Sequence, residues 1–570
     1  MAKGFSLSKF SEANVAECIQ RGISMDVGKM QRKLAQWAVN DKELRFFDIY
    51  NLIYDQNWLY EAYCKVKSNS GSKTAGCDGI NMTEFEKDLK NNLLKISQEL
   101  KDGTFEPNPT RRILIPKSNG KKRPLGIPAI RDRIVQESIR KVLEPIYEGD
   151  FSQYSFGFRP NRSTVDAIKC TMWSAQENKR YFWILEGDIS SYFDNINHKK
   201  LMKILKRRIK DKKILQLIWK FLKAGVMERK FFRDTNKGTP QGGILSPLLA
   251  NIYLNELDSY MAQNYCDFPQ KEKTSRRRKR MANFVYIRYA DDFIVMSNGR
   301  KAQVEKLKGE LTSFLKDELK LKLSKDKTKI THLNDGFRFL GFWIHRCIGQ
   351  KGKMTTKVEI PREAVKNVVN KIKATADGRT TKGSTSGKIL ALNRIYGGWC
   401  RYYQYASHAS TVFNQVHHTM FWKMAHWIGR KYRLSMPQIM RHYYRDRKAI
   451  HYGKYELLNP LTSKKYTGKF MKPNPYLESD EIVREELPTE SFWTGYEVRT
   501  GMLDLKAKIW EGSSHVCQEC GCSVDRDSAH VDHIKRYGKY KTAKSANRLD
   551  NLTILCHQCH AIKTKRELVG

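Results

Sequence analysis

Two adjacent aspartates between two apolar runs form the clearest candidate for a chemically active site in the sequence. Asp291 and Asp292 follow VYIRYA and precede FIVM, so we expect a hairpin whose tip holds both carboxylates beside an apolar sheet. Adjacent carboxylates repel each other, and keeping both ionised next to a core favours a bound cation. An Asp-Asp pair at a turn is most often only a solvated turn, so its interpretation depends on the rest of the sequence.

A second apolar run supplies that context. The run YFWILEGD ends at Asp188 and continues as ISSYFDNI. Two strands that each end in carboxylates can place these groups around a pair of divalent ions, and Mg²⁺ prefers hard oxygen ligands together with substrate phosphates. Two such ions about 4 Å apart stabilise the entering and leaving oxygens of a phosphoryl displacement. Asp188, Asp291 and Asp292 are therefore candidate Mg²⁺ ligands.

Four cysteines near the C-terminus have the spacing of a structural zinc site. Cys517-x-x-Cys520 and Cys556-x-x-Cys559 form two pairs within one short segment. Two such pairs complete a tetrahedral Zn²⁺ site, and thiolates are soft ligands that suit zinc. A small domain also gains folding free energy from a structural metal. We expect the fifth cysteine of this segment, Cys522, not to be a ligand.

The elements that position these residues belong to a long, basic chain. Its 570 residues are too many for one core and suggest about three or four domains. The formal net charge of +44 costs self-repulsion unless a polyanion neutralises it, which favours nucleic acid over a solvated basic surface or an anionic membrane. No run reaches the about 18 apolar residues that span a bilayer, and the N-terminus lacks the apolar core of a signal peptide. We therefore expect a protein of a reducing compartment with no membrane partner.

The hydrophobic patterning predicts an α+β multidomain protein. Apolar positions recur every three or four residues near the N-terminus, whereas short β-branched runs alternate with helical stretches further on. The patterning predicts helices over 1–70, an α+β region over 110–345 with an exposed basic loop at 271–280, a basic and aromatic helical region over 360–480, a linker at 471–491, and a small domain from 511.

Seven ordered blocks resemble those of reverse transcriptases and cover roughly residues 70–345. LEGDISSYFDNI, GTPQGGILSPLLANIYLNELD (238–258) and YADDFIV occur in the order found in that family. RRILIPKSNGKKRPLGIP and SFGFRPNRSTVDAI look like the preceding blocks, and LKLSKDKTKI and FRFLGFWI look like the following ones. The resemblance implies a right-hand polymerase with fingers and palm.

The resemblance also implies a role for individual residues. Asp188 and Asp291 would hold the catalytic Mg²⁺ ions, with Asp292 supporting them. Lys117 and Arg123 would grip the phosphates of the incoming dNTP, where fixed positive charge offsets the triphosphate. The alternative for these two basic residues is a surface that grips the template.

Two further positions would contact the nucleotide. Phe193 would lie under the sugar and exclude a 2′-hydroxyl, and Gln241 in the PQGG turn would help to seat the nucleotide. Gly242 and Gly243 would permit close backbone approach. The alternative for Phe193 is a simple core aromatic.

The regions that flank the polymerase blocks resemble group II intron-encoded proteins. GSKTAGCDGINMTEFEKDL (71–89) is similar to the extension before their fingers, and 392–432 is similar to their maturase domain, a helical thumb that also grips intron RNA. Aromatic rings in this region can stack on bases while cations meet phosphates. The alternative, preferred for Trp399 and Trp427, is a helical core. The interleaved residues are Trp399, Tyr402, Tyr403, Trp422 and Trp427 with Arg394, Arg401, Lys423 and Arg430.

The C-terminal segment resembles HNH endonucleases, which implies a small zinc-bound ββα-metal fold. By that resemblance Asp532 and Asn551 help to bind one Mg²⁺ or similar ion, and His533 is the general base, a role that suits a pKa near neutrality. His560 would be a metal ligand or a phosphate contact, and no role is assigned to His530. The alternative is a zinc-ribbon module that binds DNA without cutting it.

These resemblances predict a multifunctional mobile-intron protein. It would assist splicing of its intron RNA, bind the excised lariat, nick target DNA, and copy the intron RNA from the nicked 3′ end. The alternatives are a splicing maturase with relic enzyme sites and a non-intron reverse transcriptase of the retron or defence type.

The expected location is the bacterial cytoplasm, associated with the nucleoid. The expected domains are 1–110 (N-terminal extension and start of the fingers), 111–350 (fingers and palm), 351–475 (thumb and maturase), 476–510 (linker and DNA-binding region) and 511–570 (endonuclease with its zinc site).

Overall fold

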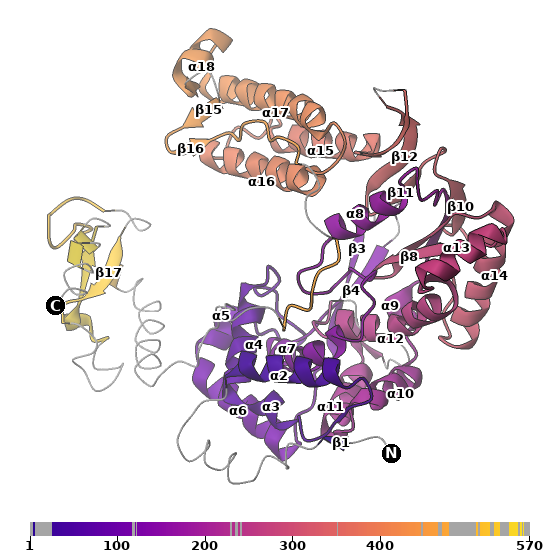
Figure 1. Ribbon diagram of the computed structural model, residues 1–570. Helices are drawn as coiled ribbons and strands as arrows, with labels where there is room; N and C mark the ends of the chain where they lie inside the picture. Colours follow the sequence, from indigo (N-terminus) through magenta and orange to yellow (C-terminus); the bar gives the residue numbers. More distant parts are fainter. Residues whose placement is uncertain are drawn as a thin grey trace.

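Most of the chain before residue 478 and parts of the C-terminal tail are described by the computed structural model (Figure 1). Two of the expected site residues, Lys117 and Gln241, lie outside the described residues. Within the described ranges, no helix has the length and apolar character needed to cross a membrane. These ranges are 4–5, 26–116, 120, 122–228, 231–233, 238–239, 242–349, 352–445, 449–464, 470–477, 509–510, 513–524, 529–535, 547–556, 559–560 and 562–563.

Helices precede the first large sheet, as the apolar spacing predicts for residues 1–70, of which 1–3 and 6–25 lie outside the described residues. The carboxylate of Asp26 accepts hydrogen bonds from the first backbone N–H groups of one helix, and Asp55 does the same for another. Gly103, at a φ of 75°, ends a third helix in the left-handed conformation that favours glycine. These elements are β1 (Gly4–Phe5), α2 (Val27–Asn40), β2 (Arg45–Phe46), α3 (Asn51–Tyr54), α4 (Gln56–Ser68), α5 (Met82–Glu86) and α6 (Leu89–Asp102).

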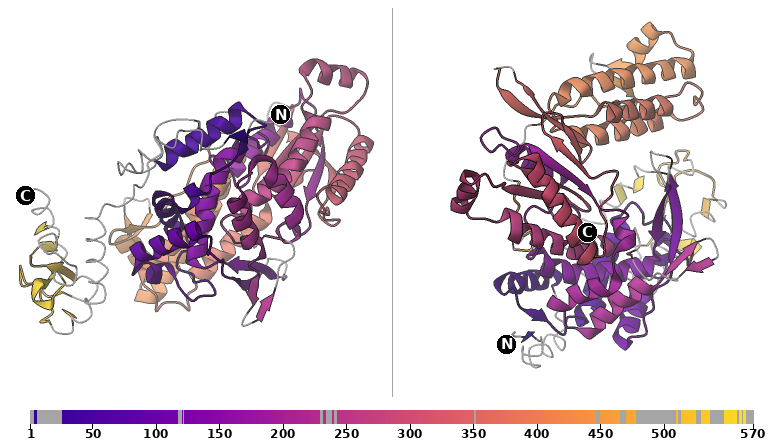
Figure 2. Two further views of the ribbon diagram at one scale, coloured as in Figure 1. Left: turned by 90° about the horizontal axis from the view of Figure 1, so that it is seen from below. Right: turned by 90° about the vertical axis from the view of Figure 1, so that its right-hand side faces the viewer.

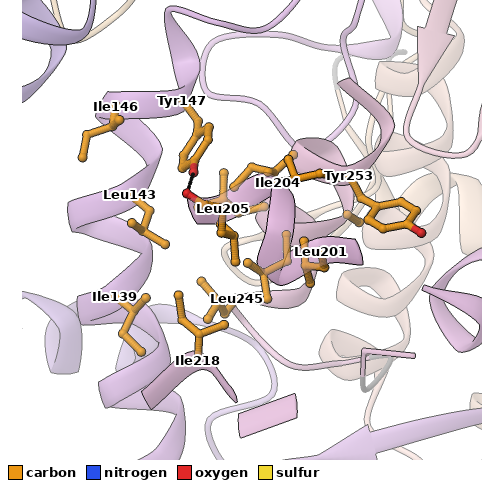
Figure 3. Close-up of a cluster of buried hydrophobic side chains, with 14 of the residues drawn as sticks. Ile139, Leu143, Ile146, Tyr147, Leu201, Ile204, Leu205, Ile218, Leu245 and Tyr253 are labelled. Atoms are coloured by element: carbon orange, nitrogen blue, oxygen red, sulfur yellow. Dashed lines mark hydrogen bonds between the residues drawn. The ribbon is translucent and has the colours of Figure 1, made fainter. Parts of the chain in front are cut away.

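One long helix, α7 (Ile130–Glu148), is buried around nearly its whole circumference. It packs against α2 and α4, and Figure 3 shows Ile139 and Leu143 turned toward side chains of two later helices. The hydroxyl of Tyr147 donates to the carbonyl of Leu205 at 3.2 Å. Because α7 is buried against elements on several sides, it joins the N-terminal helices to the polymerase region. The two later helices are α10 (His198–Arg208) and α11 (Lys212–Lys223).

A four-stranded antiparallel sheet separates two cores. Alternate side chains of a strand point to opposite faces, and Leu185 and Val295 accordingly join the core that contains α7, α12 and α14. Ile184 and Ile294 join the core that contains α8 and the later helical region. The sheet therefore ties both halves of the molecule together. Its order is β10 (Lys329–His332), β5 (Trp183–Asp188), β9 (Asp292–Ser297) and β8 (Phe284–Tyr289), with α8 (Thr164–Ser174), α12 (Ser246–Met261) and α14 (Lys301–Asp317) as covering helices.

A second four-stranded sheet carries the basic hairpin of the RRILIPKSNGKKRPLGIP block. Its first two strands pair antiparallel, with Ile115 opposite Arg123. Both strands are largely exposed toward this end of the hairpin, so the side chains there are available to a ligand. The sheet order is β4 (Lys122–Ile127), β3 (Thr110–Pro116), β6 (Val226–Glu228) and β7 (Phe231–Arg233).

The basic insert at 271–280 is a helix, and the expectation of a loop was wrong. It forms α13 (Gln270–Arg278), which buries none of its side chains. Arg, Lys and Glu are good helix formers, and no glycine or proline interrupts this stretch. Glu272 in the first turn and Arg276 to Arg278 in the last turn also match the helix dipole. The short helices α9 (Tyr192–Asn195) and η2 (Ala262–Cys266) complete this region.

A helical bundle follows the polymerase region, as the sequence predicts, after a small antiparallel sheet. Figures 1 and 2 show the bundle at one end of the molecule, with the N-terminal helices at the other. Trp427 is only 1% exposed in its core. The elements are β11 (Phe337–Phe339), β12 (Phe342–Ile348), β13 (Met354–Glu359), α15 (Arg362–Thr375), α16 (Thr385–Tyr403), α17 (Ala409–Tyr432), α18 (Met436–Tyr443), β14 (Tyr444–Arg445), β15 (Ala449–Tyr452) and β16 (Tyr455–Glu456).

Residues 470–477 return from the bundle to the polymerase region, although part of them was expected to be a linker. The ring of Phe470 lies 5.8 Å from that of Trp173. The hydroxyl of Tyr476 donates to Glu144 in α7. The first part of the predicted linker is therefore packed, and residues 478–491 lie outside the described residues.

The tail has a small core of its own. Cys517, Val524 and Ile554 are buried together with Ala529 and Leu555. The antiparallel strands β17 (His530–His533) and β18 (Leu552–Leu555) pair in this core, and the short helix η4 (Leu549–Asn551) precedes β18. Two paired strands around a cysteine cluster agree with the expected ββ part of the fold.

Candidate active sites

The four-stranded sheet that contains β5 and β9 brings the three expected carboxylates together. Asp188 at the end of β5 lies opposite Asp292 at the start of β9. Tyr289 also pairs with Asp292, so Ala290 and Asp291 form the tip of a tight hairpin. Burial and the charge of Asp188 raise the pKa of Asp291, and burial with both neighbouring carboxylates raises the pKa of Asp292 to about 6. A divalent cation would relieve this repulsion, and the donor set suits Mg²⁺.

Two basic side chains approach these carboxylates. The ammonium of Lys327 donates to Asp188 Oδ1 at 2.9 Å, and this hydrogen bond raises the pKa of Lys327. The charge of Arg123, from the hairpin β3–β4, lowers the pKa of Asp291. Arg123 is thus close enough to act electrostatically on Asp291, and its contact with the incoming nucleotide stays a prediction. Lys327 lies in the LKLSKDKTKI block, but nothing in the sequence distinguishes it from the other three lysines of that block.

Arg288 fixes the hairpin tip from inside the protein. Its guanidinium is 0% exposed and donates two hydrogen bonds to Asp258 in α12, at 2.7 and 2.6 Å. A third nitrogen donates to the carbonyl of Ala290 and to Asn251 Oδ1, both at 2.9 Å. Ala290 has a φ of 58°, which an L residue rarely adopts. Arg288 therefore anchors an unfavourable turn to a helix.

The SFGFRPNRS block packs against the same turn. A Cβ atom on Gly157 would lie 2.4 Å from the backbone nitrogen of Ala290, so only glycine fits there. Asn251 Nδ2 donates to the carbonyl of Gly157 at 2.8 Å, and Phe156 N donates to the carbonyl of Arg288 at 2.9 Å. The block that precedes the carboxylates in the sequence thus supports them in space.

The positions expected to contact a nucleotide are partly described. Phe193 is buried, and its ring meets that of the exposed Phe158 edge-on at 6.3 Å. Gly242 has a φ of 115°, and a Cβ there would lie 2.2 Å from the carbonyl oxygen of Gly126 in β4. The close backbone approach expected at this glycine is therefore present. The roles of Lys117 and Gln241 stay predictions, because both residues lie outside the described residues.

The helical bundle presents cations and two aromatic rings on its surface. Trp427 belongs to the core, as the alternative interpretation holds, and Trp399 is packed against the same core. Trp422 and Tyr402 are 38% and 40% exposed. Tyr402 also donates to the carbonyl of Leu340 at 2.8 Å, which ties α16 to the small sheet. The exposed cations are Arg394, Arg401, Lys423 and Arg430.

Four of the tail's cysteines form one cluster. The sulfur atoms of Cys517, Cys520, Cys556 and Cys559 all lie within 4.8 Å of one another, which suits one tetrahedral zinc ion. The fifth thiol, Cys522, touches the cluster, with its Sγ 3.4 Å from Cys520 Sγ, but it is not one of the four whose sulfur atoms all lie within 4.8 Å of one another. The geometry thus groups the same four residues that the two C-x-x-C pairs indicate.

His533 has a partner that orients its ring. Its Nε2 lies 2.9 Å from Asn547 Oδ1, so Nε2 carries the hydrogen when it donates to this amide, and Nδ1 is then the basic nitrogen. The neighbouring Asp532 forms an ion pair with Lys563 at 3.1 Å. His560 stacks on His530 with ring centroids 4.7 Å apart. The sequence alone did not reveal the contact between Asn547 and His533.

Asn551 uses both ends of its side-chain amide on the backbone. Its Oδ1 accepts from Lys535 N at 2.9 Å, and its Nδ2 donates to Lys535 O at 3.2 Å. The carbonyl of Asn551 also accepts from Ile534 N at 2.7 Å. These contacts favour a role in holding the loop after His533. The expectation that Asn551 binds the nuclease metal stays a prediction.

Comparisons with known proteins identify three protein families along the chain. Residues 115–344 match the model of reverse transcriptases (RNA-dependent DNA polymerases), residues 365–444 match the group II intron maturase-specific domain, and residues 517–566 match the HNH endonucleases. The group II intron-encoded protein LtrA of Lactococcus lactis subsp. cremoris is 31% identical over 598 aligned positions, covering 90% of this chain and 95% of the relative. The chain belongs to the group II intron-encoded proteins.

Two further relatives support this family assignment. Protein YkfC of Escherichia coli (strain K12) is 42% identical over 383 residues, which is 64% of this chain and all of the relative. A putative COX1/OXI3 intron 2 protein of Saccharomyces cerevisiae is 26% identical over 90% of this chain and 65% of the relative. This group II intron-encoded protein thus carries reverse transcriptase, maturase and DNA endonuclease domains. The maturase match favours the intron assignment over a retron or defence enzyme.

We expect Arg288→Met to lower the kcat of primer extension by about 10²-fold, because misplacement by about 1 Å costs this much. The KM for dNTP should change little. Loss of one partner of a buried ion pair should also destabilise the polymerase region by about 3–5 kcal/mol. The measurements are steady-state primer extension and thermal unfolding.

The double variant Arg288→Met/Asp258→Leu separates these effects. It removes the uncompensated buried carboxylate, so stability should recover while kcat stays low, because nothing then holds the carbonyl of Ala290. Recovery of kcat together with stability would show that Arg288 is only a structural residue.

We expect Cys556→Ser in the full chain to lose its zinc, because a tetrahedral site needs all four thiolates. Cys522→Ser is the matched control and should retain about one zinc ion per chain. Elemental analysis after dialysis measures both. Equal loss of zinc from the two variants would contradict the assignment of the four ligands.

Proposed function

We propose that this protein copies its intron RNA into DNA, using as primer the 3′ end produced when its own tail nicks the target DNA. The observation that carries the proposal is the convergence of Asp188, Asp291 and Asp292 at one hairpin, with basic side chains on either side. This arrangement suits phosphoryl transfer, and the matched family models suit an RNA template and DNA cleavage.

In the polymerase site, each residue has a distinct task. Asp188, Asp291 and Asp292 hold Mg²⁺, which when bound neutralises the charge that develops on the transferred phosphate. Arg123 and Lys117 contact the triphosphate, where fixed cations offset its charge. Gln241 beside Gly242 seats the nucleotide, and Phe193 lies beneath its sugar, where a ring leaves no space for a 2′-hydroxyl.

In the tail, His533 removes a proton from the attacking water through Nδ1, while Asn547 keeps the ring oriented. Asp532 and His560 hold one Mg²⁺ or similar ion, which when bound supplies positive charge to the scissile phosphate. Asn551 helps to bind this ion, and its side-chain amide also holds the loop that follows His533. Zn²⁺ at the four cysteines would stabilise the fold of this domain, which is too small to bury a large core.

Maturase activity rests on the basic bundle, which would bind intron RNA in a lariat ribonucleoprotein. Retention of the three polymerase carboxylates and of an oriented His533 argues against a maturase whose enzyme sites are relics.

The domain limits that accompany this proposal are 1–110, 111–350 for fingers and palm, 351–475 for the thumb, 476–510 and 511–570. The proposed location is the bacterial cytoplasm, in association with the nucleoid.

We expect Asp291→Ala to lower Mg²⁺-dependent primer extension on an RNA template by about 10³-fold or more, since metal stabilisation of the transition state is worth several kcal/mol. Asp335→Ala is the control, because it removes an exposed carboxylate from a turn of the same region. Nicking of target DNA should persist in both variants. Polymerisation that survived in Asp291→Ala would contradict the active-site assignment.

We expect His533→Ala to lower DNA nicking by about 10²- to 10⁴-fold, the usual contribution of a general base. The control His515→Ala alters an exposed histidine of the same tail. Nicking is measured on supercoiled plasmid that carries the target site, and primer extension is measured in parallel. Persistent nicking in His533→Ala, with the zinc retained, would favour the DNA-binding module without cleavage.

A further inference from the structure

The helices α10 and α11 form a hollow of about 1110 Å³ with a strongly basic lining. Six lysines line it, and none of the described lining residues is acidic. The apolar floor includes Met202, Leu215 and Trp219. Lysine stems pack along such a floor while their ammonium groups remain in water. We call this hollow the α10–α11 groove; its lysines are Lys199, Lys203, Lys206, Lys210, Lys212 and Lys220.

The lysines are spaced so that they share one face. Lys199, Lys203 and Lys206 follow one another at intervals of four and three residues, which places them in a row along α10. On α11, Lys212 and Lys220 stand at the two ends of a similar row. Rows on two facing helices give positive charge on both sides of the groove, as a phosphodiester backbone running between them requires.

Other basic residues of α10 are paired with carboxylates. Lys200 contacts Glu318 at 3.2 Å, and Arg207 contacts Glu256 at 2.7 Å. Arg208 lies 3.4 Å from Asp150. On α10, these three cations, which do not line the groove, are thus neutralised by carboxylates.

The groove lysines differ in this respect. Lys220 is paired with Glu106 at 2.6 Å. The side chains of the other five have no hydrogen-bond or ion-pair partner among the residues that the structure describes. Concentrated charge of one sign costs self-repulsion unless a polyanion neutralises it. Five lysines on one face without a carboxylate partner among the described residues are the observation that points to a ligand.

The groove lies apart from the helical bundle. In Figure 1, α10 and α11 are at the lower end of the molecule, whereas α16 and α17 of the bundle are at the upper end. Strand β5 ends at Asp188, and α10 begins ten residues later, at His198. A ligand in the groove is thus held by the polymerase region but away from the bundle.

We propose that the α10–α11 groove is an anchoring site for the phosphodiester backbone of the intron RNA, distinct from the path along which that RNA is copied. This inference rests on the proposed function, because it requires one RNA to be both ligand and template. A template must move through the copying site at each step, so contacts that keep the RNA attached have to lie elsewhere. Target DNA does not need an additional anchoring site, since it is held both by the tail and at the primer terminus.

The test is the triple variant Lys199→Gln/Lys203→Gln/Lys206→Gln in the full-length protein. The probe is a transcript of the DNA that flanks the reading frame, bound at several salt concentrations. Each lost phosphate contact should make the slope of log K against log [salt] shallower by about one. We expect a slope shallower by about two to three and binding weaker by about tenfold or more near physiological salt.

The matched control is Lys301→Gln/Lys306→Gln/Lys316→Gln on α14, which removes the same charge from another exposed helix. Lys301 and Lys306 are paired with Glu305 and Glu310, and exposed pairs of this kind contribute little stability. The control should bind the transcript nearly as the unchanged protein does. Equal weakening in both triple variants would mean that net charge alone matters, and would overturn the proposal.

Primer extension on a short unstructured RNA template separates this inference from the proposed function. The groove variant should extend such a primer at the unchanged rate. A parallel loss of extension would place the groove on the template path and overturn the inference. Weakened binding of duplex target DNA with unchanged binding of the transcript would also overturn it. Failure of extension in the unchanged protein would instead contradict the proposed function.

Discussion

A guanidinium without solvent contact determines where the polymerase carboxylates lie. Arg288 shares two hydrogen bonds with Asp258 and one with the carbonyl of Ala290, so the ion pair joins helix α12 to the tip of the β8–β9 hairpin. Burying two charges is expensive unless their hydrogen bonds are satisfied, and here the arginine is satisfied by three partners. The ion pair therefore fixes the local geometry more than it adds stability: it keeps Ala290 in a rare conformation and Asp292 opposite Asp188.

The sheet that carries the carboxylates transmits this constraint to both halves of the molecule. Its two faces belong to different cores, one built on α7 and the N-terminal helices, the other continuous with the helical bundle. Interiors pack at crystal-like density, so displacement of the sheet would disturb both cores. Residues 470–477 add a second connection, because Tyr476 donates to Glu144 of α7 after the chain has left the bundle. The position of the bundle is thus coupled to the polymerase region by packing and by this return segment.

The sequence predicted the strands, the helical bundle and the cluster of four cysteines, because each depends on local periodicity or spacing. It did not predict α13, where charge density suggested a loop although the residues are good helix formers. It also missed Lys327, Arg288 and Asn547. Each acts through a long-range contact, with Asp188, Asp258 and His533 respectively, and nothing in the local pattern identifies the partner. Residues that carry chemistry occur in recognisable blocks, whereas residues that hold them are visible only after folding.

Both candidate Mg²⁺ centres pair an aspartate with a lysine. Lys327 contacts Asp188 in the polymerase region, and Lys563 contacts Asp532 in the tail. Lys327 offsets part of the repulsion among three clustered carboxylates, and Lys563 also donates to the carbonyl of His533, which fixes the end of β17. In the polymerase region the ammonium thus offsets repulsion within a cluster of acids, and in the tail it neutralises a single carboxylate. An ammonium on a flexible stem can move aside when a divalent ion binds, since its hydrogen bond is replaced by hydration. The two sites, on unrelated folds, therefore use the same means to keep their ligands in position.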